Sequence, residues 1–278
     1  MSVDDLEDNL ALDISDNEKE NQVVTVADEI SKNTTGIKRK AETVSTEKSE
    51  NKKIKKNGLN NLSTDSTFIK EFSILPLEQV VQYFNINLKK EDEKMFLFSK
   101  SDFKDTSSYP LNNRNLKNFN NFLSTFINQR DAKTKAIIVS ATNIRVADIH
   151  RSIHLDGEKN DKFLKAIKLF NKNKLQKDIE TIVEIAKSKD EKYKNVKNYI
   201  TTPTRLLTIL ESINQEKKYD NLWLKDKSKL DIIVDCQFMI NSGKNVNILN
   251  DYQTVYKLLD LLKDLKQIKG NSLRIILY

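Results

Sequence analysis

Apolar residues from residue 67 onward follow two alternating patterns along the chain. Stripes at spacings of three and four residues are typical of amphipathic helices, whereas short aliphatic and β-branched runs are typical of buried strands. The helical pattern covers residues 77–87, 116–127, 144–155, 179–186, 203–213 and 255–268, and the strand pattern covers residues 136–141, 196–201, 231–235 and 273–277. Residues 166–170 fit either element.

Strands that alternate with helices predict a parallel sheet covered by helices on both faces, which is a three-layer α/β fold. Sheets of this class bind their ligands at the carboxyl ends of the strands. The loops that follow Ala141, Thr201 and Asp235 are therefore the places where we expect functional residues.

The beginning of the chain lacks these patterns, and its first aromatic residue is Phe68. A segment without large apolar side chains cannot offset its ordering entropy. Residues 1–65 are therefore predicted to be a disordered tail, and residues 66–278 are predicted to be the folded domain. Within that domain, residues 66–110 are expected to form an N-terminal arm that packs on the body. Phe96, Phe98 and Phe103 are aromatic residues of this arm that indicate such packing.

The net charge of +7 is unevenly distributed along the chain. Residues 1–30 carry ten acids and one base, for a net charge of −9, and residues 31–60 carry nine bases and three acids, for +6. The remaining residues carry +10. Secretory and mitochondrial leaders begin with positive charge, and no apolar run approaches the roughly 18 residues of a membrane span. We expect a soluble intracellular protein with no membrane contact.

Two basic clusters lie inside the predicted tail and are separated by eleven residues. The first is Lys38, Arg39 and Lys40, and the second is Lys52, Lys53, Lys55 and Lys56. This arrangement matches a bipartite nuclear import signal, which implies an import receptor as a partner and a nuclear location. The alternative is a basic linker that no receptor binds.

Residues 31–60 fused to a cytoplasmic reporter are expected to carry the reporter into the nucleus, because this segment holds both basic clusters. Fluorescence microscopy measures the nuclear share of the reporter. The control replaces the second cluster, Lys52, Lys53, Lys55 and Lys56, by alanine. A reporter that stays in the cytoplasm contradicts the import hypothesis.

Three segments at predicted strand ends resemble motifs of the DEAD-box RNA helicases. Residues 202–207 resemble the T-P-G-R-L motif, with Thr204 in place of its glycine. Residues 232–237 resemble the V-L-D-E-A-D strand and keep only its first acid, Asp235. Residues 136–147 resemble the P-T-R-E-L-A region, matched at Thr142, with Arg145 two positions beyond the arginine of the family.

The order and spacing of these motifs are similar to the first RecA-like domain of that family over roughly residues 110–278. The resemblance implies a RecA-like (P-loop NTPase-like) version of the three-layer sheet. It also implies contact with the RNA sugar–phosphate backbone, because hydroxyls, helix-start amides and arginines suit phosphate oxygens. The candidate RNA-binding residues are Thr142, Asn143, Arg145, Thr202, Thr204 and Arg205.

The chemistry of the helicase ATPase is missing from the chain. Its phosphate loop needs the pattern G-x-x-x-x-G-K-[ST], which is absent, and no glycine lies between Gly58 and Gly157. Cys236 replaces the acid that orients the attacking water, so Asp235 is interpreted as a vestigial acid of the motif. We therefore expect no catalytic activity and no cofactor.

Other residues with functional chemistry have simpler interpretations. His150 and His154 are spaced by one helical turn, as in some metal sites, but the sequence shows no obvious third ligand. Surface histidines and no metal are expected. Cys236 has no second cysteine and is expected to be a packed side chain. Aromatic residues that could stack on bases, but are expected in the core, are Tyr219, Trp223 and Tyr252.

An acidic start, a lysine-rich neck and a degenerate RecA-like body are together similar to the Cms-type ribosomal small-subunit protein family. Residues 101–107 and 168–172 add to this resemblance. It implies a non-enzymatic nucleolar scaffold in ribosome biogenesis and early ribosomal RNA processing, with pre-ribosomal RNA and small-subunit processome proteins as partners. Two alternatives remain open: a residual nucleotide-binding switch, and a nuclear chromatin or transcription scaffold without an RNA role.

Overall fold

The computed structural model describes residues 66–88, 96–127, 134–157, 166–170, 173–187, 196, 198–215, 228–237, 239–241 and 244–278. The predicted tail with both basic clusters lies outside these ranges, as do Tyr219 and Trp223. None of the helices in the described ranges is long and apolar enough to cross a membrane.

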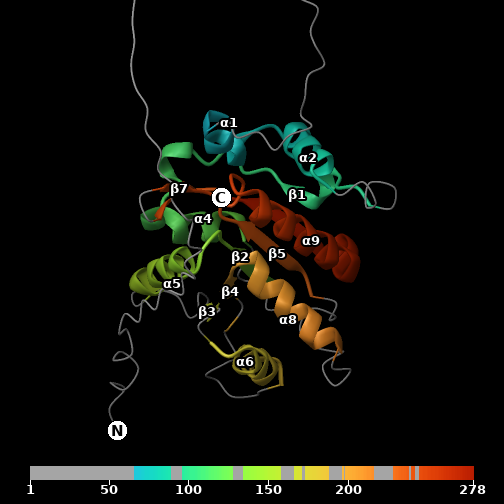
Figure 1. Cartoon of the computed structure of the whole chain (residues 1–278). Coiled ribbons are helices and arrows are strands. Elements are labelled where there is room, and N and C mark those ends of the chain that lie inside the picture. Colours follow the sequence, from blue (N-terminus) through green and yellow to red (C-terminus); the bar gives the residue numbers. More distant parts are fainter. Residues whose placement is uncertain are drawn as a thin grey trace, which may run out of the picture. The chain divides into compact units, whose positions relative to one another are not determined.

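Among the described residues, six parallel strands form one sheet in the order β1-β8-β5-β2-β4-β3 (Figure 1). They are β1 (Phe103–Lys104), β2 (Lys135–Val139), β3 (Ala166–Leu169), β4 (Asn198–Thr201), β5 (Leu230–Val234) and β8 (Leu273–Leu277). At the centre of the sheet, Ile137 of β2 lies opposite Tyr199 of β4 and Ile232 of β5. The predicted parallel α/β sheet is confirmed, and residues 166–169 form a strand.

Two strand features go beyond what the apolar pattern predicts. β1 has two residues, which is too short for an alternating pattern to show. It pairs in parallel with β8 and extends the sheet on that side. β6 (Met239–Asn241) and β7 (Lys244–Val246) form a separate antiparallel pair. Along the chain, this pair lies between β5 and the helix that begins at Tyr252.

The helices other than α1 follow the apolar stripes to within a few residues, and no stripe predicted α1. They are α1 (Ser66–Glu71), α2 (Leu77–Ile86), α4 (Phe119–Phe126), α5 (Asn143–Gly157), α6 (Leu175–Lys187), α8 (Pro203–Gln215) and α9 (Tyr252–Lys269). Short 3-10 turns are η1 (Phe72–Ile74), η2 (Lys100–Asp102), η3 (Leu111–Asn113), η4 (Leu116–Asn118) and η6 (Gly270–Ser272). Gly270 ends α9 with a φ of 54°, which suits a residue without a Cβ.

Side chains alternate between the two faces of the sheet and build a core on each face. On one face, Ile138, Ile233 and Ile276 pack with the buried residues of α4 and α5. On the opposite face, Ile137 and Ile232 pack with α6, α8 and α9. Figure 1 shows α8 and α9 running beside each other over this second face, and the two helices are in contact. The domain is therefore a three-layer RecA-like sheet.

Aromatic side chains connect the segment before residue 110 to the body. The ring of Phe84 lies 5.9 Å from that of Phe72, 5.8 Å from that of Phe98 and 5.3 Å from that of Phe103, measured between centroids. Phe98 and Phe103 are buried in the core that also contains α9, and Phe96 packs against that core. Aromatic pairs of this kind contribute about 0.5–1.5 kcal/mol each beyond their area burial, so the segment shares the core of the sheet.

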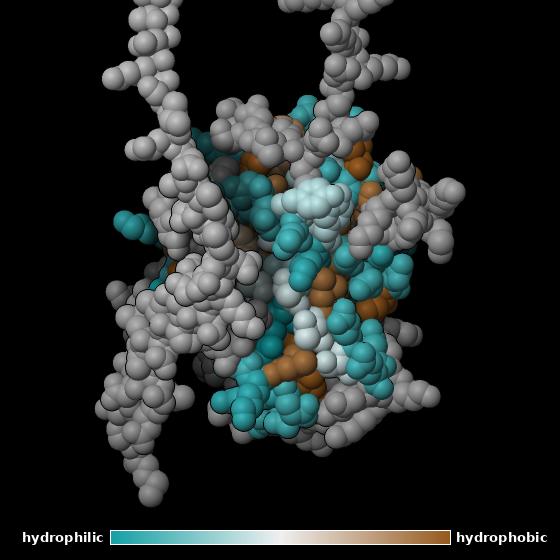
Figure 2. All heavy atoms as spheres, viewed as in Figure 1, coloured by the Kyte–Doolittle hydropathy of each residue, from teal (hydrophilic) through white to brown (hydrophobic). Residues whose placement is uncertain are grey.

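On the face seen in Figure 2, hydrophobic residues form small groups that are separated by hydrophilic ones. The large apolar side chains that are most exposed among the described residues are Leu97, Ile144 and Tyr252. The expectation that Tyr252 lies in the core is wrong, since it is 60% exposed. It is the first residue of α9, and the buried side of that helix begins at Val255.

Candidate functional site

The loops after β2, β4 and β5 meet at the carboxyl edge of the sheet, where the sequence predicts functional residues. Backbone hydrogen bonds continue the sheet ladder into these loops. The amide of Asp235 donates to the carbonyl of Val139 at 2.9 Å, and the amide of Ser140 donates to the carbonyl of Thr201 at 3.0 Å. The loops are therefore held in a fixed register, and so are the side chains that they carry.

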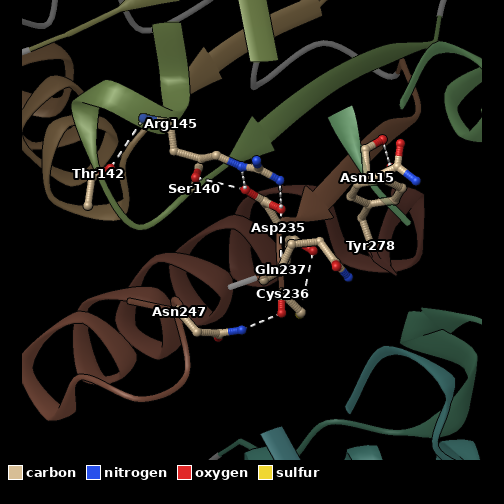
Figure 3. A network of polar contacts seen from close by, with 10 residues as sticks. Asn115, Ser140, Thr142, Arg145, Asp235, Cys236, Gln237, Asn247 and Tyr278 are labelled. Carbon is tan, nitrogen blue, oxygen red and sulfur yellow. Dashed lines mark hydrogen bonds and ion pairs between the residues drawn. The ribbon is translucent and has the colours of Figure 1, made fainter. Parts of the chain in front are cut away.

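Asp235 lies at the centre of this edge and is 2% exposed (Figure 3). Its Oδ2 accepts hydrogen bonds from Nε of Arg145 at 2.8 Å and from Oγ of Ser140 at 3.0 Å. Its Oδ1 accepts from Nη2 of Arg145 at 3.2 Å and from the amide of Gln237 at 3.4 Å. A carboxylate offers about four acceptor positions, and all of those of Asp235 are therefore occupied by groups of the protein.

Arg145 forms a buried two-pronged ion pair with Asp235 and is 7% exposed. Burial opposes the charge of its guanidinium, but the charge and hydrogen bonds of Asp235 outweigh burial and raise the pKa of Arg145 above its ordinary value. The forked geometry of arginine matches the two carboxylate oxygens. The guanidinium therefore stays charged, and the pair closes the carboxyl edge between β2 and β5.

A second arginine repeats this arrangement one strand further along the sheet. Nε and Nη2 of Arg205 donate to Oδ2 of Asp178 at 2.9 and 2.7 Å, and Nη2 also donates to the carbonyl of Asn173 at 2.8 Å. Both Arg205 and Asp178 are buried. This pair connects the start of α8 to the start of α6, and it closes the edge between β4 and β3.

The two arginines belong to one local pattern, Thr-x-x-Arg, at the start of a helix. Oγ1 of Thr142 accepts a hydrogen bond from the amide of Arg145 at 3.2 Å, and Oγ1 of Thr202 accepts one from the amide of Arg205 at 3.3 Å. Each threonine thus caps its helix. In the same first turn, Arg145 reaches the acid that follows β5, and Arg205 reaches an acid in the first turn of α6. The pattern fixes the starts of α5 and α8 on the sheet.

The six candidate RNA-binding residues therefore lie at one edge but differ in accessibility. Arg145 and Arg205 are buried and paired with acids, Thr202 is buried, and Thr204 is exposed. Thr142 and Asn143 are half-buried. The buried Oδ1 of Asn143 has no hydrogen-bond partner in the described part of the chain. RNA contact by these residues stays a prediction, and Thr204 is the member that solvent reaches most readily.

Arg114 is a third buried arginine of this edge, and the sequence analysis did not single it out. Its Nη1 donates to the carbonyl of Leu277 at 2.9 Å, and its Nη2 donates to the carbonyls of Thr106 and Tyr109. Burial lowers the pKa of Arg114. Its guanidinium also lies 5.4 Å from the ring centroid of Phe122. The sequence contained one signal for Arg114. Arginine is rare in this lysine-rich chain, so each arginine is a candidate for a specific contact.

The carboxyl edge does not fit a nucleotide with its magnesium ion. The loop after β1 contains no glycine, and the side chain of Arg114 bonds to its carbonyls. A phosphate loop instead turns glycine-rich backbone amides toward the phosphates. The retained acid, Asp235, has its acceptor positions filled by Arg145, Ser140 and Gln237. No catalytic step through a nucleotide follows from these residues.

Cys236 follows Asp235 and is 2% exposed. Its carbonyl accepts a hydrogen bond from Nδ2 of Asn247, and its amide donates to the carbonyl of Tyr278 at 2.8 Å (Figure 3). Burial, with the negative charge of Asp235, raises the pKa of the Cys236 thiol. The packed cysteine expected from the sequence is what the structure contains.

We expect Cys236 to resist alkylation in the folded protein at pH 8. A raised pKa keeps the thiol protonated at that pH, and the thiolate is the reactive form. Mass spectrometry after iodoacetamide treatment measures the modified fraction, with the protein in denaturant as the control. Equal rates in the folded and denatured states would contradict a buried, protonated thiol.

His150 and His154 stack on each other on α5, with ring centroids 4.0 Å apart. In the part of the chain that the structure describes, no group of three His, Cys, Asp or Glu side chains could hold a metal ion. Nδ1 of His154 lies 2.9 Å from the carbonyl oxygen of His150. The two rings therefore interact with each other and with the backbone.

The fold and this edge together define a RecA-like domain whose retained motif acid is bound by an arginine of the same chain. Comparison with known proteins adds a relative: "Protein CMS1" of Saccharomyces cerevisiae is 31% identical over 211 residues, which cover 72% of this chain. The chain belongs to the Cms1-type family. The match spans 65% of the length of the yeast protein. No family model matches the chain, and no solved structure matches it.

Proposed function

We propose that this chain is a non-enzymatic, nucleolar ribosome-biogenesis factor that binds pre-ribosomal RNA and proteins of the small-subunit processome as a scaffold. The observation that carries the proposal is the ion pair of Asp235 with Arg145 at the carboxyl edge. An ATPase of this fold needs an accessible acid that binds magnesium. In this chain the corresponding acid, Asp235, is buried and paired with Arg145. The resemblance of three segments to DEAD-box helicase motifs supports a role on RNA without the ATPase step, and the similarity to the yeast protein supports the family assignment.

The helix starts at the carboxyl edge supply groups that suit an RNA backbone. The first turn of a helix carries amides without partners in the helix, together with a positive dipole end. α5 and α8 both begin at this edge, and their Thr-x-x-Arg patterns fix them there. We assign the RNA contact to the loops that contain the six candidates. In this proposal the arginines position the helices, while the exposed Thr204 faces a phosphate.

Nuclear import through the two basic clusters would bring the factor to its site of action. The clusters lie outside the described residues, so their support is the sequence pattern. A residual nucleotide switch is the first alternative, and ATP binding tighter than millimolar would favour it. A chromatin or transcription scaffold is the second, and recovery of histones and DNA with the chain would favour it.

Purification of the tagged full-length chain after ultraviolet crosslinking tests the proposal. Sequencing of the bound RNA and mass spectrometry of the bound proteins are expected to recover pre-ribosomal RNA and processome subunits. Recovery of histones and DNA without ribosomal RNA would overturn the proposal.

A charge substitution at the edge tests the RNA contact itself. Thr204→Asp places a negative charge beside the proposed phosphate, and we expect RNA crosslinking to fall on the order of tenfold. Asn214→Asp is the matched control, because it adds the same charge to an exposed position near the other end of α8. Crosslinking that is equal in the two variants would remove the contact from this loop.

A further inference from the structure

We propose that the outer edge of the sheet beside α5 is a second contact for single-stranded RNA. It is formed by an edge cluster of five residues: His150, Arg151, His154, Lys168 and Phe170. The inference rests on the proposed function and adds to it a surface that continues from the carboxyl edge along α5. It assigns cations to the phosphodiester groups and flat rings to the bases.

The fold brings the edge cluster together from two elements. β3 is the last strand of the sheet, and α5 packs against it. Lys168 lies in β3, and Phe170 directly follows the strand. Phe170 packs against the core that contains Ile149 and Ile153 of α5. The residues of the edge cluster thus lie together where α5 packs on the outermost strand, β3.

Among the described residues, Arg151 of the edge cluster pairs with an acid and Lys168 does not. The ammonium of Lys168 lies 5.1 Å from the ring centroid of Phe170. Burial, together with the nearby charge of Arg151, lowers the pKa of Lys168. Arg151 bonds to Asp148 with one guanidinium nitrogen, and its side chain is 64% exposed. Like charges that are held together in this way attract an anion.

The flat rings of the edge cluster lie beside these cations. His150 and His154 stack with an interplanar angle of 27°, and Phe170 lies under Lys168. Burial, with the charges of His154 and Lys168, lowers the pKa of His150 to about 3, so this imidazole is neutral at neutral pH. Exposed His154 presents the pair to solvent. Aromatic side chains, histidine included, are the surfaces on which unpaired RNA bases stack.

The combination of rings and cations favours RNA over an acidic protein partner. An acidic peptide would use only the positive charges, whereas single-stranded RNA uses both the charges and the rings. The site begins beside the carboxyl edge and extends away from it, because Phe170 directly follows β3, whose Leu169 pairs with Thr201 of β4. α5 begins there at Asn143, and His154 lies eleven residues further along, which is about 16 Å at 1.5 Å per residue. One RNA strand that follows α5 could reach both contacts.

Fluorescence anisotropy with the full-length chain and a fluorescein-labelled uridine 20-mer tests the site. We expect Lys168→Glu to weaken binding on the order of tenfold and to lower the slope of log affinity against log salt by about one. His154→Ala is expected to weaken binding with little change in that slope. Lys257→Glu is the matched control, because Lys257 is an exposed lysine of α9 on the other face of the sheet. Circular dichroism verifies that each variant is folded, and Lys168→Gln replaces Lys168→Glu if the latter fails to fold.

The outcomes separate this inference from the proposed function. If the wild-type chain binds the RNA and the Lys168 and His154 variants bind equally well, the edge cluster is rejected while the proposed function stands. If the wild-type chain binds no RNA, both are rejected. Poly-glutamate binding that depends on Lys168, in the absence of RNA binding, would assign the surface to an acidic protein instead.

Discussion

Replacement of Arg145 by methionine is expected to destabilise the fold by about 3–5 kcal/mol. The substitution leaves the carboxylate of Asp235 buried with only Ser140 and the amide of Gln237 as donors. An unpaired charge inside a protein is far more costly than the same charge in water. Urea unfolding followed by circular dichroism measures the loss, which is a large share of the 5–15 kcal/mol that typically stabilises a domain.

The double variant Arg145→Met with Asp235→Leu is the control for this prediction. When both charges are removed, no ion remains buried, and replacement of a buried pair by apolar residues is often neutral or stabilising. We therefore expect the double variant to regain most of the stability that Arg145→Met loses. Losses that simply add would show that the two side chains are not coupled.

Replacement of Arg205 by glutamate is expected to be at least as damaging, with a loss of about 3–5 kcal/mol or more. The substitution removes the two-pronged pair with Asp178 and places a second carboxylate in the same buried space. It also leaves the carbonyl of Asn173 without its guanidinium donor. The midpoint of urea unfolding measures the effect.

Arg205→Lys is the matched variant, because it keeps the charge and loses the fork. We expect its loss to be smaller than that of Arg205→Glu. An unfolding midpoint of Arg205→Glu equal to that of the wild type would contradict the buried pair. The prediction also bears on RNA studies, since weakened RNA binding by Arg205→Glu would report unfolding as well as lost contact. Thr204→Asp avoids this ambiguity because Thr204 is exposed.

Much of the fold was predictable because apolar spacing is a local property. The aliphatic run at residues 231–235 predicted β5, and the leucine stripe at residues 255–268 predicted α9. The three motif segments likewise predicted which loops meet at the carboxyl edge. β1 was missed because two residues carry no periodicity.

The partners of the arginines were not predictable in the same way. Arg145 and Asp235 are 90 positions apart, and Arg205 and Asp178 are 27 apart. The sequence predicted that both arginines bind RNA, because a helix start with threonine and arginine suits the phosphate groups of the backbone. Only the strand order, with β5 beside β2 and β3 beside β4, brings a buried acid within reach of each.

The sequence by itself determined that this protein has a helix-covered parallel sheet, that its motif loops share one edge, and that these 278 residues do not contain the phosphate-loop motif. These properties depend on residue type and on spacing along the chain. The tertiary structure decided that Asp235 and Asp178 are bound by arginines and that a cationic, aromatic cluster gathers beside α5. The reason is physical: burial and pairing depend on which distant residues pack together, and strand order sets that.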